Sequence, residues 1–242
     1  MAIKAVLFDL DGTLLPMDQN MFLKTYFGLL TEKMVKSGYE AGTFMKALLA
    51  GTDAMVKNDG SKTNEALFWE VFGSFYTPKT LPPIGLFDAF YAEDFPRTRA
   101  VCGEDARPRA IVDAVKAKGL DCVLATAPAF PAVATETRMG YVGLTPADFN
   151  LYTTYENSTY CKPSVGYYRE VLEKIGLAPA ECLMVGNDVT DDMEPATEAG
   201  MSVFLLTEYL INKNGADISR YPHGGYDELL AFVRALPARD VR

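Results

Sequence analysis

Near its amino terminus the chain carries a short apolar run, Ala5 to Phe8, that leads directly into two acids, Asp9 and Asp11, followed by Gly12 and Thr13. The run is composed of residues that favour a strand. Residues i and i+2 of a strand point the same way, so both acids can face one pocket at the strand's carboxyl end. Open α/β sheets usually bind ligands at that end. Gly12 allows the chain to turn away immediately, because glycine adopts backbone angles closed to other residues.

Two carboxylates held this close raise each other's pKa unless a positive group lies between them. An oxygen-seeking divalent ion such as Mg²⁺ is suited to that place. With a phosphate neutralised by the metal, Asp9 or Asp11 can attack phosphorus as a nucleophile while the other transfers the proton. The alternative is an ordinary strand followed by a solvated acidic turn. The motifs further along the chain decide between these interpretations.

The second half of the chain alternates between strand-like and helix-like patterns. The predicted strands cover residues 122–125, 149–155, 182–185 and 202–206. The predicted helices cover residues 109–118, 131–139, 164–175, 192–199 and 227–236. Strand, helix and strand in this order indicate parallel crossovers, because a parallel pair needs a long connection between its strands. The pattern predicts an α/β protein with a doubly wound, three-layer parallel sheet.

The stretch between these parts, residues 17–96, has a different character. Apolar residues recur there at three- and four-residue steps, as in amphipathic helices, and residues 57–60 and 77–83 interrupt them. The stretch contains 14 of the chain's 28 aromatic residues. Such a density indicates a hydrophobic interior of its own. We therefore predict a separate small helical domain over residues 17–96, inserted into a core formed by residues 1–16 and 97–242.

Composition argues against several classes of protein. The 23 Lys and Arg residues against 32 Asp and Glu give a net charge of −9, which disfavours a nucleic-acid-binding surface. The one histidine, His223, lies in a loop-like Pro-His-Gly-Gly stretch, so neither a histidine-rich zinc site nor a Ser-His-Asp triad is expected. The cysteines lack C-x-x-C spacing and are expected to be reduced: Cys102, Cys122, Cys161 and Cys182.

Neither a signal peptide nor a membrane span is recognised in the sequence. The apolar run after Lys4 is too short for a signal peptide and ends in acids. No uninterrupted apolar stretch reaches the roughly 18 residues that a membrane span requires. A cytoplasmic protein that contacts neither membrane nor nucleic acid is expected, and the sequence leaves its oligomeric state open.

Further polar residues follow the predicted strands or precede the predicted helices. Thr126 ends one strand, and its hydroxyl and the next backbone N–H are suited to a phosphate oxygen, although threonine often only caps a helix. Lys162 stands at a helix entrance and can neutralise a phosphate or remain solvated. Asp188 follows a strand and a glycine, as Asp9 follows a strand, and can complete a metal's oxygen shell. Asp192 lies four residues on, in the first turn of a helix. For Asp191 we favour a plain acidic helix start.

Taken in order, these stretches resemble the four motifs of the haloacid dehalogenase (HAD) superfamily of phosphohydrolases. The motifs are Asp-Leu-Asp-Gly-Thr at 9–13, Thr126 after an apolar strand, Lys162-Pro163, and Gly-Asn-Asp-Val-Thr-Asp-Asp at 186–192. The first and last are specific, and the common order strengthens the middle two. The resemblance covers residues 1–16 and 97–242. It implies a Rossmann-like core, with residues 17–96 in the place of the family's helical cap.

The resemblance also implies roles for single residues. Asp9 would be the nucleophile that forms an aspartyl-phosphate, and Asp11 the acid and base that protonates the leaving group and then activates water. The phosphate would be bound by Thr126, Lys162, Ala127 and Leu10. The Mg²⁺ cofactor would be held by Asp9, Asp11, Asp188 and Asp192, with Asp11 using its backbone carbonyl and Asp192 supporting from close by.

The predicted activity is Mg²⁺-dependent hydrolysis of a small phosphorylated metabolite, which would make the chain a phosphoric monoester hydrolase. Asp11 disfavours dehalogenation, because family members that cleave carbon–halogen bonds lack the second acid. Two departures, Ala127 where many members have asparagine and Asn187 where many have glycine, affect the shape of the pocket and remove no catalytic group. Two alternatives stay open: a phosphotransferase or mutase resembling β-phosphoglucomutase, and a catalytically idle binding module.

Overall fold

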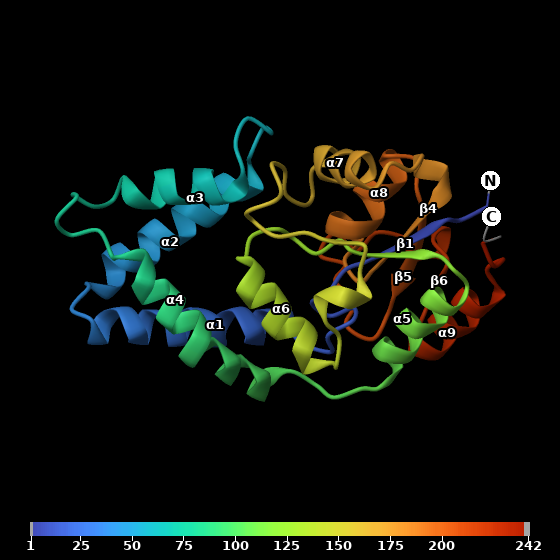
Figure 1. Ribbon diagram of the computed structural model, residues 1–242, viewed down its shortest axis with the longest axis horizontal. Helices are drawn as coiled ribbons and strands as arrows, with labels where there is room; N and C mark the ends of the chain where they lie inside the picture. Colours follow the sequence, from blue (N-terminus) through green and yellow to red (C-terminus); the bar gives the residue numbers. More distant parts are fainter. Residues whose placement is uncertain (1, 240–242) are drawn as a thin grey trace.

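A six-stranded parallel sheet lies at the centre of the core. We describe residues 2–239 in a computed structural model (Figure 1). The strand order is β3-β2-β1-β4-β5-β6, so the chain winds outward from β1 in both directions. The strands are β1 (Ala5–Phe8), β2 (Asp121–Leu124), β3 (Leu151–Tyr152), β4 (Cys182–Gly186), β5 (Ser202–Leu206) and β6 (His223–Gly224). The predicted doubly wound parallel sheet is confirmed.

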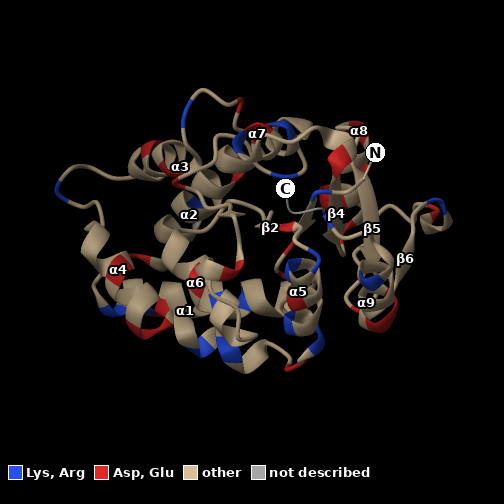
Figure 2. Ribbon diagram, turned by 45° about the vertical axis from the view of Figure 1, so that its right-hand side comes forward, with Lys and Arg blue, Asp and Glu red and all other residues tan. Residues whose placement is uncertain are grey.

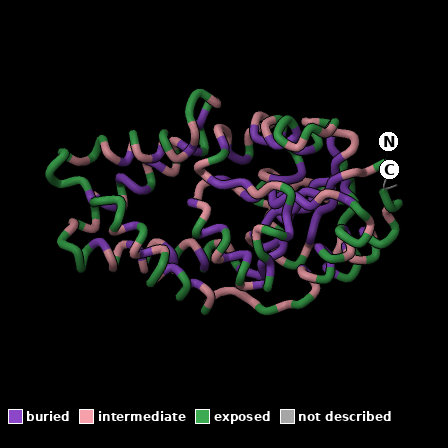
Figure 3. The backbone as a smooth tube through the Cα atoms, in the orientation of Figure 1, coloured by how far each residue is buried: buried purple, intermediate pink, exposed green. Residues whose placement is uncertain are grey.

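Helices cover both faces of this sheet, and for that reason its central strands are apolar throughout. All four residues of β1 are fully buried, as expected for a strand packed on both sides (Figure 3). Val6 and Phe8 face one layer, and Ala5 and Leu7 face the other. The first layer contains α5 (Arg107–Ala117), α6 (Ala132–Tyr141) and α9 (Tyr226–Ala235). The second contains α7 (Val165–Ile175) and α8 (Glu194–Glu198).

The helices between β1 and α5 lie together to one side of the sheet (Figure 1). They are α1 (Gln19–Lys36), α2 (Ala41–Val56), α3 (Asn64–Gly73) and α4 (Ile84–Glu93), followed by a 3₁₀ helix, η1 (Phe95–Val101). Many of their aromatic rings pack edge to face, as Phe72 does with Trp69 at 5.6 Å and with Phe87 at 5.6 Å between ring centroids. The many aromatic residues of segment 17–96 thus form a hydrophobic interior between these helices.

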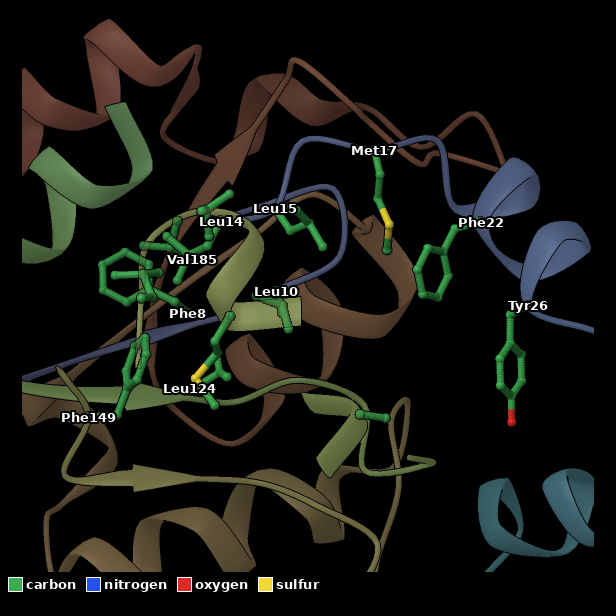
Figure 4. Close-up of a cluster of buried hydrophobic side chains, with 14 of the residues drawn as sticks. Phe8, Leu10, Leu14, Leu15, Met17, Phe22, Tyr26, Leu124, Phe149 and Val185 are labelled. Atoms are coloured by element: carbon green, nitrogen blue, oxygen red, sulfur yellow. The ribbon is translucent and has the colours of Figure 1, made fainter. Parts of the chain in front are cut away.

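This interior is continuous with the core beneath the sheet. Figure 4 shows Phe8, Leu124 and Val185 beside the strands, with Phe22 and Tyr26 of α1 extending the same cluster toward the helices. Tyr26 packs its ring against that of Phe130, in the loop after β2, at 5.1 Å. The helices are therefore attached to the core by aromatic packing as well as by the chain itself.

Several predicted elements differ in extent from those observed. The strand expected over 149–155 contracts to the two residues of β3. The helix expected over 192–199 begins as a π-helical turn, Val189–Met193, before α8. The loop expected around His223 instead forms β6, whose pairing with β5 is a main-chain property that composition does not reveal. The remaining short 3₁₀ segments are Pro146–Asp148, Pro179–Glu181 and Ile218–Arg220.

The outer surface of the core carries mixed charge, with basic and acidic residues interspersed on α5 and α9 (Figure 2). All four cysteines are free thiols, as predicted. Within residues 2–239, no helix combines the length and the apolar character needed to cross a bilayer.

One buried acid of the core, Asp148, should make the free energy of unfolding depend on pH. Asp148 accepts from Lys116 Nζ at 2.8 Å and Arg109 Nη1 at 2.9 Å. Burial opposes ionisation, but Lys116, the Thr145 N–H and Arg109 together lower the pKa of Asp148 to about 2. Its stabilisation is complete above the ordinary aspartate pKa and is lost as the pH falls toward 2. Asp148→Asn should therefore cost about 2 kcal/mol of unfolding free energy at pH 7. Urea denaturation at a series of pH values should show the difference shrinking below about pH 4.

Candidate active site

Three neighbouring strands, β2, β1 and β4, bring the predicted site residues to one edge of the sheet. Asp9 directly follows β1, Thr126 lies two residues after β2, and Asp188 lies two residues after β4. The strands run in parallel and in register, with Phe8 opposite both Leu124 and Val185. All three polar side chains are buried. The edge lies where the strand order reverses direction, which is the usual ligand-binding position in such sheets.

Lys162 joins two of the acids. Its Nζ lies 2.9 Å from Asp9 Oδ1 and 2.6 Å from Asp192 Oδ1. The lysine is buried and precedes α7, whose N-cap Ser164 accepts from the Gly166 N–H at 3.1 Å. Burial lowers the pKa of Lys162, but Asp192 and Asp9 more than offset this and raise it well above its usual value. The lysine is therefore a fixed cation that orients the Asp9 carboxylate.

Asp192 and Asp188 are held together by the turn after β4. Asp192 Oδ2 accepts from the backbone N–H of Asp188 at 3.0 Å, and Asp188 Oδ1 accepts from the N–H groups of Thr190 and Asp191 at 2.8 and 3.1 Å. A Cβ atom at position 186 would overlap the Asp192 carboxylate, which explains the glycine there. Both Asp192 oxygens are thus engaged by Lys162 and the Asp188 N–H, so Asp192 is placed to position its neighbours.

The loop after β1 is closed around Gly12. Gly12 has a φ of +84°, and its N–H donates to the Leu15 carbonyl at 2.8 Å. The Leu10 carbonyl accepts from Leu15 N–H at 2.7 Å, so Leu10, predicted as a phosphate contact, lies in a fixed turn. Asn187 bridges this loop to the next: its Oδ1 accepts from Thr13 Oγ1 at 3.1 Å and its Nδ2 donates to the Tyr209 carbonyl at 2.6 Å. Asn187, which stands where many family members have glycine, therefore connects the loops that follow β1, β4 and β5.

The turn around Thr126 and Ala127 is fixed by two side chains that the sequence did not single out. The Thr126 carbonyl accepts from Thr153 Oγ1 at 2.7 Å and from the Tyr167 hydroxyl at 2.9 Å. Tyr167 is fully buried, and its ring also lies 6.0 Å from Lys162 Nζ. Tyr167 thus supports both the Thr126 turn and Lys162, although the sequence shows it only as an apolar helix position.

Arg138 of α6 is the principal site residue that the sequence analysis missed. Its guanidinium is fully buried and forms an ion pair and hydrogen bond with Asp11 Oδ2. The guanidinium carbon also lies 4.3 Å from the ring centroid of Phe130 and 5.9 Å from that of Phe22. One sequence pattern could have indicated this role: Arg138 lies one helical turn after Ala134, so a charged residue falls on the buried, apolar face of α6.

The two acids after β1 therefore have different partners. Lys162 contacts Asp9, whereas Arg138 contacts Asp11. Burial raises the pKa of Asp11, the Arg138 charge and hydrogen bond oppose this, and the neighbouring Asp9 adds to the rise. A carboxyl with a raised pKa holds a proton at higher pH than usual, which suits a group that must give up and take back a proton.

Removing Arg138 should disturb Asp11 specifically. In Arg138→Met the pKa of Asp11 loses its main lowering influence and should rise, because the carboxyl stays buried without its partner. We expect kcat toward a phosphate ester to fall roughly 10- to 100-fold. The pH profile of kcat/KM should show its Asp11-dependent limb displaced to higher pH, and Arg138→Lys should displace it less. An unchanged profile in Arg138→Met would show that Arg138 is only a packing residue.

The charge at this edge fits a divalent cation. Four acids (Asp9, Asp11, Asp188 and Asp192) outnumber two bases (Lys162 and Arg138) here, and burial raises the pKa of Asp11 and raises that of Asp192 to about 7. Asp11 Oδ1 is buried with no hydrogen-bond partner. Residues 2–239 contain no group of three or more His, Cys, Asp and Glu side chains arranged to hold a metal. Mg²⁺ does not need one, since it is usually bound through one or two carboxylates, with waters and substrate phosphate completing its shell.

Fold and site together define an α/β protein with a doubly wound parallel sheet, whose site holds several carboxylates and has a buried lysine beside Asp9. A family model described as haloacid dehalogenase-like hydrolase matches residues 3–200. The chain therefore belongs to this family, and the resemblance drawn from its motifs is confirmed.

Individual proteins are also similar to this chain. A glyceraldehyde 3-phosphate phosphatase from Methanothermobacter thermautotrophicus is 32% identical over 78 residues, which are 29% of this chain and 34% of that protein. A HAD phosphatase from Thermococcus onnurineus superposes with a TM-score of 0.60 at 16% identity, covering 98% of this chain and 100% of its own. YfnB from Bacillus subtilis, described as a HAD-hydrolase bound to magnesium, superposes with a TM-score of 0.56 at 15% identity, covering 96% and 99%. At these identities the two structures establish the fold alone.

Proposed function

We propose that this protein is a Mg²⁺-dependent phosphatase that hydrolyses a small phosphate monoester through an aspartyl-phosphate. The observation that carries the proposal is the buried chain of contacts from Asp9 through Lys162 to Asp192 and on to the backbone of Asp188. A lysine held by two carboxylates is unsuited to be a proton donor. Lys162 instead fixes the Asp9 carboxylate in place beside Asp11, whose pKa is raised. The match to a glyceraldehyde 3-phosphate phosphatase supports the same class of reaction.

In the first step an Asp9 oxygen attacks phosphorus, and the bond between phosphorus and the ester oxygen breaks. Asp11 gives its proton to the departing alkoxide, so the alcohol leaves neutral. Lys162 holds Asp9 in line and, with the Thr126 hydroxyl and the Ala127 and Leu10 backbone N–H groups, stabilises charge on the phosphoryl oxygens. Arg138 keeps the Asp11 carboxyl oriented.

In the second step Asp11, now ionised, takes a proton from water, and the water oxygen attacks the aspartyl phosphorus. Inorganic phosphate leaves, and Asp9 and the proton on Asp11 are restored. A Mg²⁺ ion held by Asp9, Asp188 and the Asp11 carbonyl would neutralise phosphate charge throughout, while Asp192 positions Lys162 and the Asp188 turn. Residues 17–96 would act as a cap that excludes bulk water, a role supported by the interdomain movement described for YfnB.

The direct test is hydrolysis of para-nitrophenyl phosphate with and without metal. EDTA should lower the rate at least about 100-fold, and added Mg²⁺ should restore it, because the excess carboxylates repel an unneutralised phosphate. Circular dichroism in EDTA should show the fold intact. Turnover that is unaffected by EDTA would contradict the metal requirement, and tight Mg²⁺ binding without any turnover would favour the idle binding module. Product analysis for free phosphate separates hydrolysis from transfer to a sugar hydroxyl.

A further inference from the structure

A cavity of about 530 Å³ lies between the helices of segment 17–96 and the core, and it reaches the proposed catalytic residues. Asp11 and Ala127 both line it, so it is continuous with the place where the phosphate would bind. Its walls are formed mainly by aliphatic and aromatic side chains from all four helices α1 to α4, including Phe22, Leu48, Trp69 and Phe87. A group attached to the phosphate would enter this space.

The charged residues that line the cavity are all acidic. They are Asp11, Glu65, Asp88 and Glu156, and none of the described lining residues is lysine or arginine. Glu156 accepts from the Ala132 N–H of α6 at 2.9 Å, so part of its charge is satisfied. Burial and the neighbouring Glu156 raise the pKa of Glu65. Arg138 lies behind this lining, but its guanidinium is already paired with Asp11. A second phosphate or a carboxylate in the cavity would therefore meet acidic side chains and find no lysine or arginine in the lining to bind it.

The edge of the cavity is also apolar where it meets solvent. Val56 of α2, Ile84 of α4 and Val133 of α6 line it with 40%, 60% and 45% of their surface exposed. Large aliphatic side chains gathered around an opening are typical of a site that receives an apolar ligand. One neutral polar feature of the lining is the pair of Tyr26 and Tyr91 hydroxyls, 3.1 Å apart, which suits a single hydroxyl on the ligand.

Resting on the proposed function, we infer that the substrate is a phosphate monoester of an apolar alcohol, aromatic or alkyl, that carries no second anionic group. The phosphate would lie at Asp9 and the apolar body would fill the cavity between the helices and the loop around Phe130. This occupant matches the shape, the apolar walls and the negative charge of the space. Substrates with a carboxylate or a second phosphate beside the ester are disfavoured by the same three properties.

Three esters that differ in one substituent test this inference: 2-phenylethyl, ethyl and 2-carboxyethyl phosphate. They release primary alcohols of similar reactivity, so differences in kcat/KM report the cavity. With the full-length chain and Mg²⁺ we expect phenylethyl to be used best and carboxyethyl worst, with a ratio of about 100-fold between them. A phenylethyl value equal to or below the carboxyethyl value overturns the inference and leaves the phosphatase proposal intact. Failure to hydrolyse any ester, para-nitrophenyl phosphate included, overturns both.

Lysine substitutions at the cavity edge provide a second test of the inference. Val56→Lys and Ile84→Lys place a cation at exposed positions and should fold normally. Each should lower the phenylethyl to carboxyethyl ratio about tenfold, by weakening the apolar surface and attracting the carboxylate. Val35→Lys is the matched control, since Val35 is 49% exposed on α1 and does not line the cavity, and its ratio should match the wild type. Equal ratios in all three variants would show that the cavity does not receive the leaving group.

Discussion

Asp9→Asn is expected to lower kcat toward para-nitrophenyl phosphate by about 10⁴-fold or more, because an amide cannot act as the nucleophile. The change keeps the size of the side chain, and its carbonyl oxygen can still accept from Lys162 Nζ, 2.9 Å from Asp9 Oδ1 in the native chain. The fold should therefore survive. Steady-state kinetics with Mg²⁺, together with thermal unfolding, measure both properties on the same sample.

Asp148→Asn serves as the matched control for this substitution. Asp148 is 8% exposed and Asp9 is 7% exposed, and both accept from a lysine, but Asp148 lies among α5 and the loop after α6. It should lose stability and keep its kcat. If Asp9→Asn retained more than about a tenth of the wild-type kcat, or if both variants lost activity alike, Asp9 would not be the nucleophile.

Lys162→Met should affect both stability and turnover. It leaves Asp9 and Asp192 buried without the cation that lies 2.9 and 2.6 Å from their oxygens. Removing one partner from a buried ion pair costs about 3–5 kcal/mol, and the loss of charge near the phosphoryl group should lower kcat about 10²- to 10³-fold. Urea denaturation in EDTA measures the first effect, and kinetics at saturating Mg²⁺ measure the second.

Lys116→Met provides the comparison for that variant. Lys116 also lies 2.8 Å from a buried carboxylate, but its side chain is 40% exposed and Asp148 keeps Arg109 as a second partner. We expect a loss of at most about 1 kcal/mol and an unchanged kcat. A Lys162→Met protein as stable and active as Lys116→Met would refute the role assigned to the buried lysine.

The parts of the molecule that were predictable from the sequence are those encoded locally. An apolar run that ends in polar residues specifies both a strand and the location of its carboxyl end, and this placed Asp9, Thr126 and Asp188 correctly at the sheet edge. Once the strands were parallel, their ends had to meet. The strand at 202–206 was predicted to the residue. The boundaries that failed, at β3 and at the start of α8, depend on main-chain pairing and on a π-helical turn that side-chain pattern does not encode.

The parts that were not predictable depend on packing between distant segments. Arg138 meets Asp11 across 127 residues, and Thr13 meets Asn187 across 174. Neither pairing follows from spacing, because both depend on how α6 and the loop after β4 pack against the loop after β1. The cavity is a further case: the aromatic density of residues 17–96 is visible in the sequence, but only the packed helices reveal the space left between them and the core.

Hydrolysis by the proposed route requires transient phosphorylation of one carboxylate, that of Asp9. Wild-type protein mixed with phosphate ester and Mg²⁺ can be quenched within milliseconds, reduced with borohydride and digested for mass spectrometry. Borohydride converts an acyl phosphate to an alcohol, so homoserine should replace aspartate in the peptide that contains residue 9, and only when substrate is present. Turnover with no such product at Asp9, or with the modified residue at another acid such as Asp188, would contradict the mechanism.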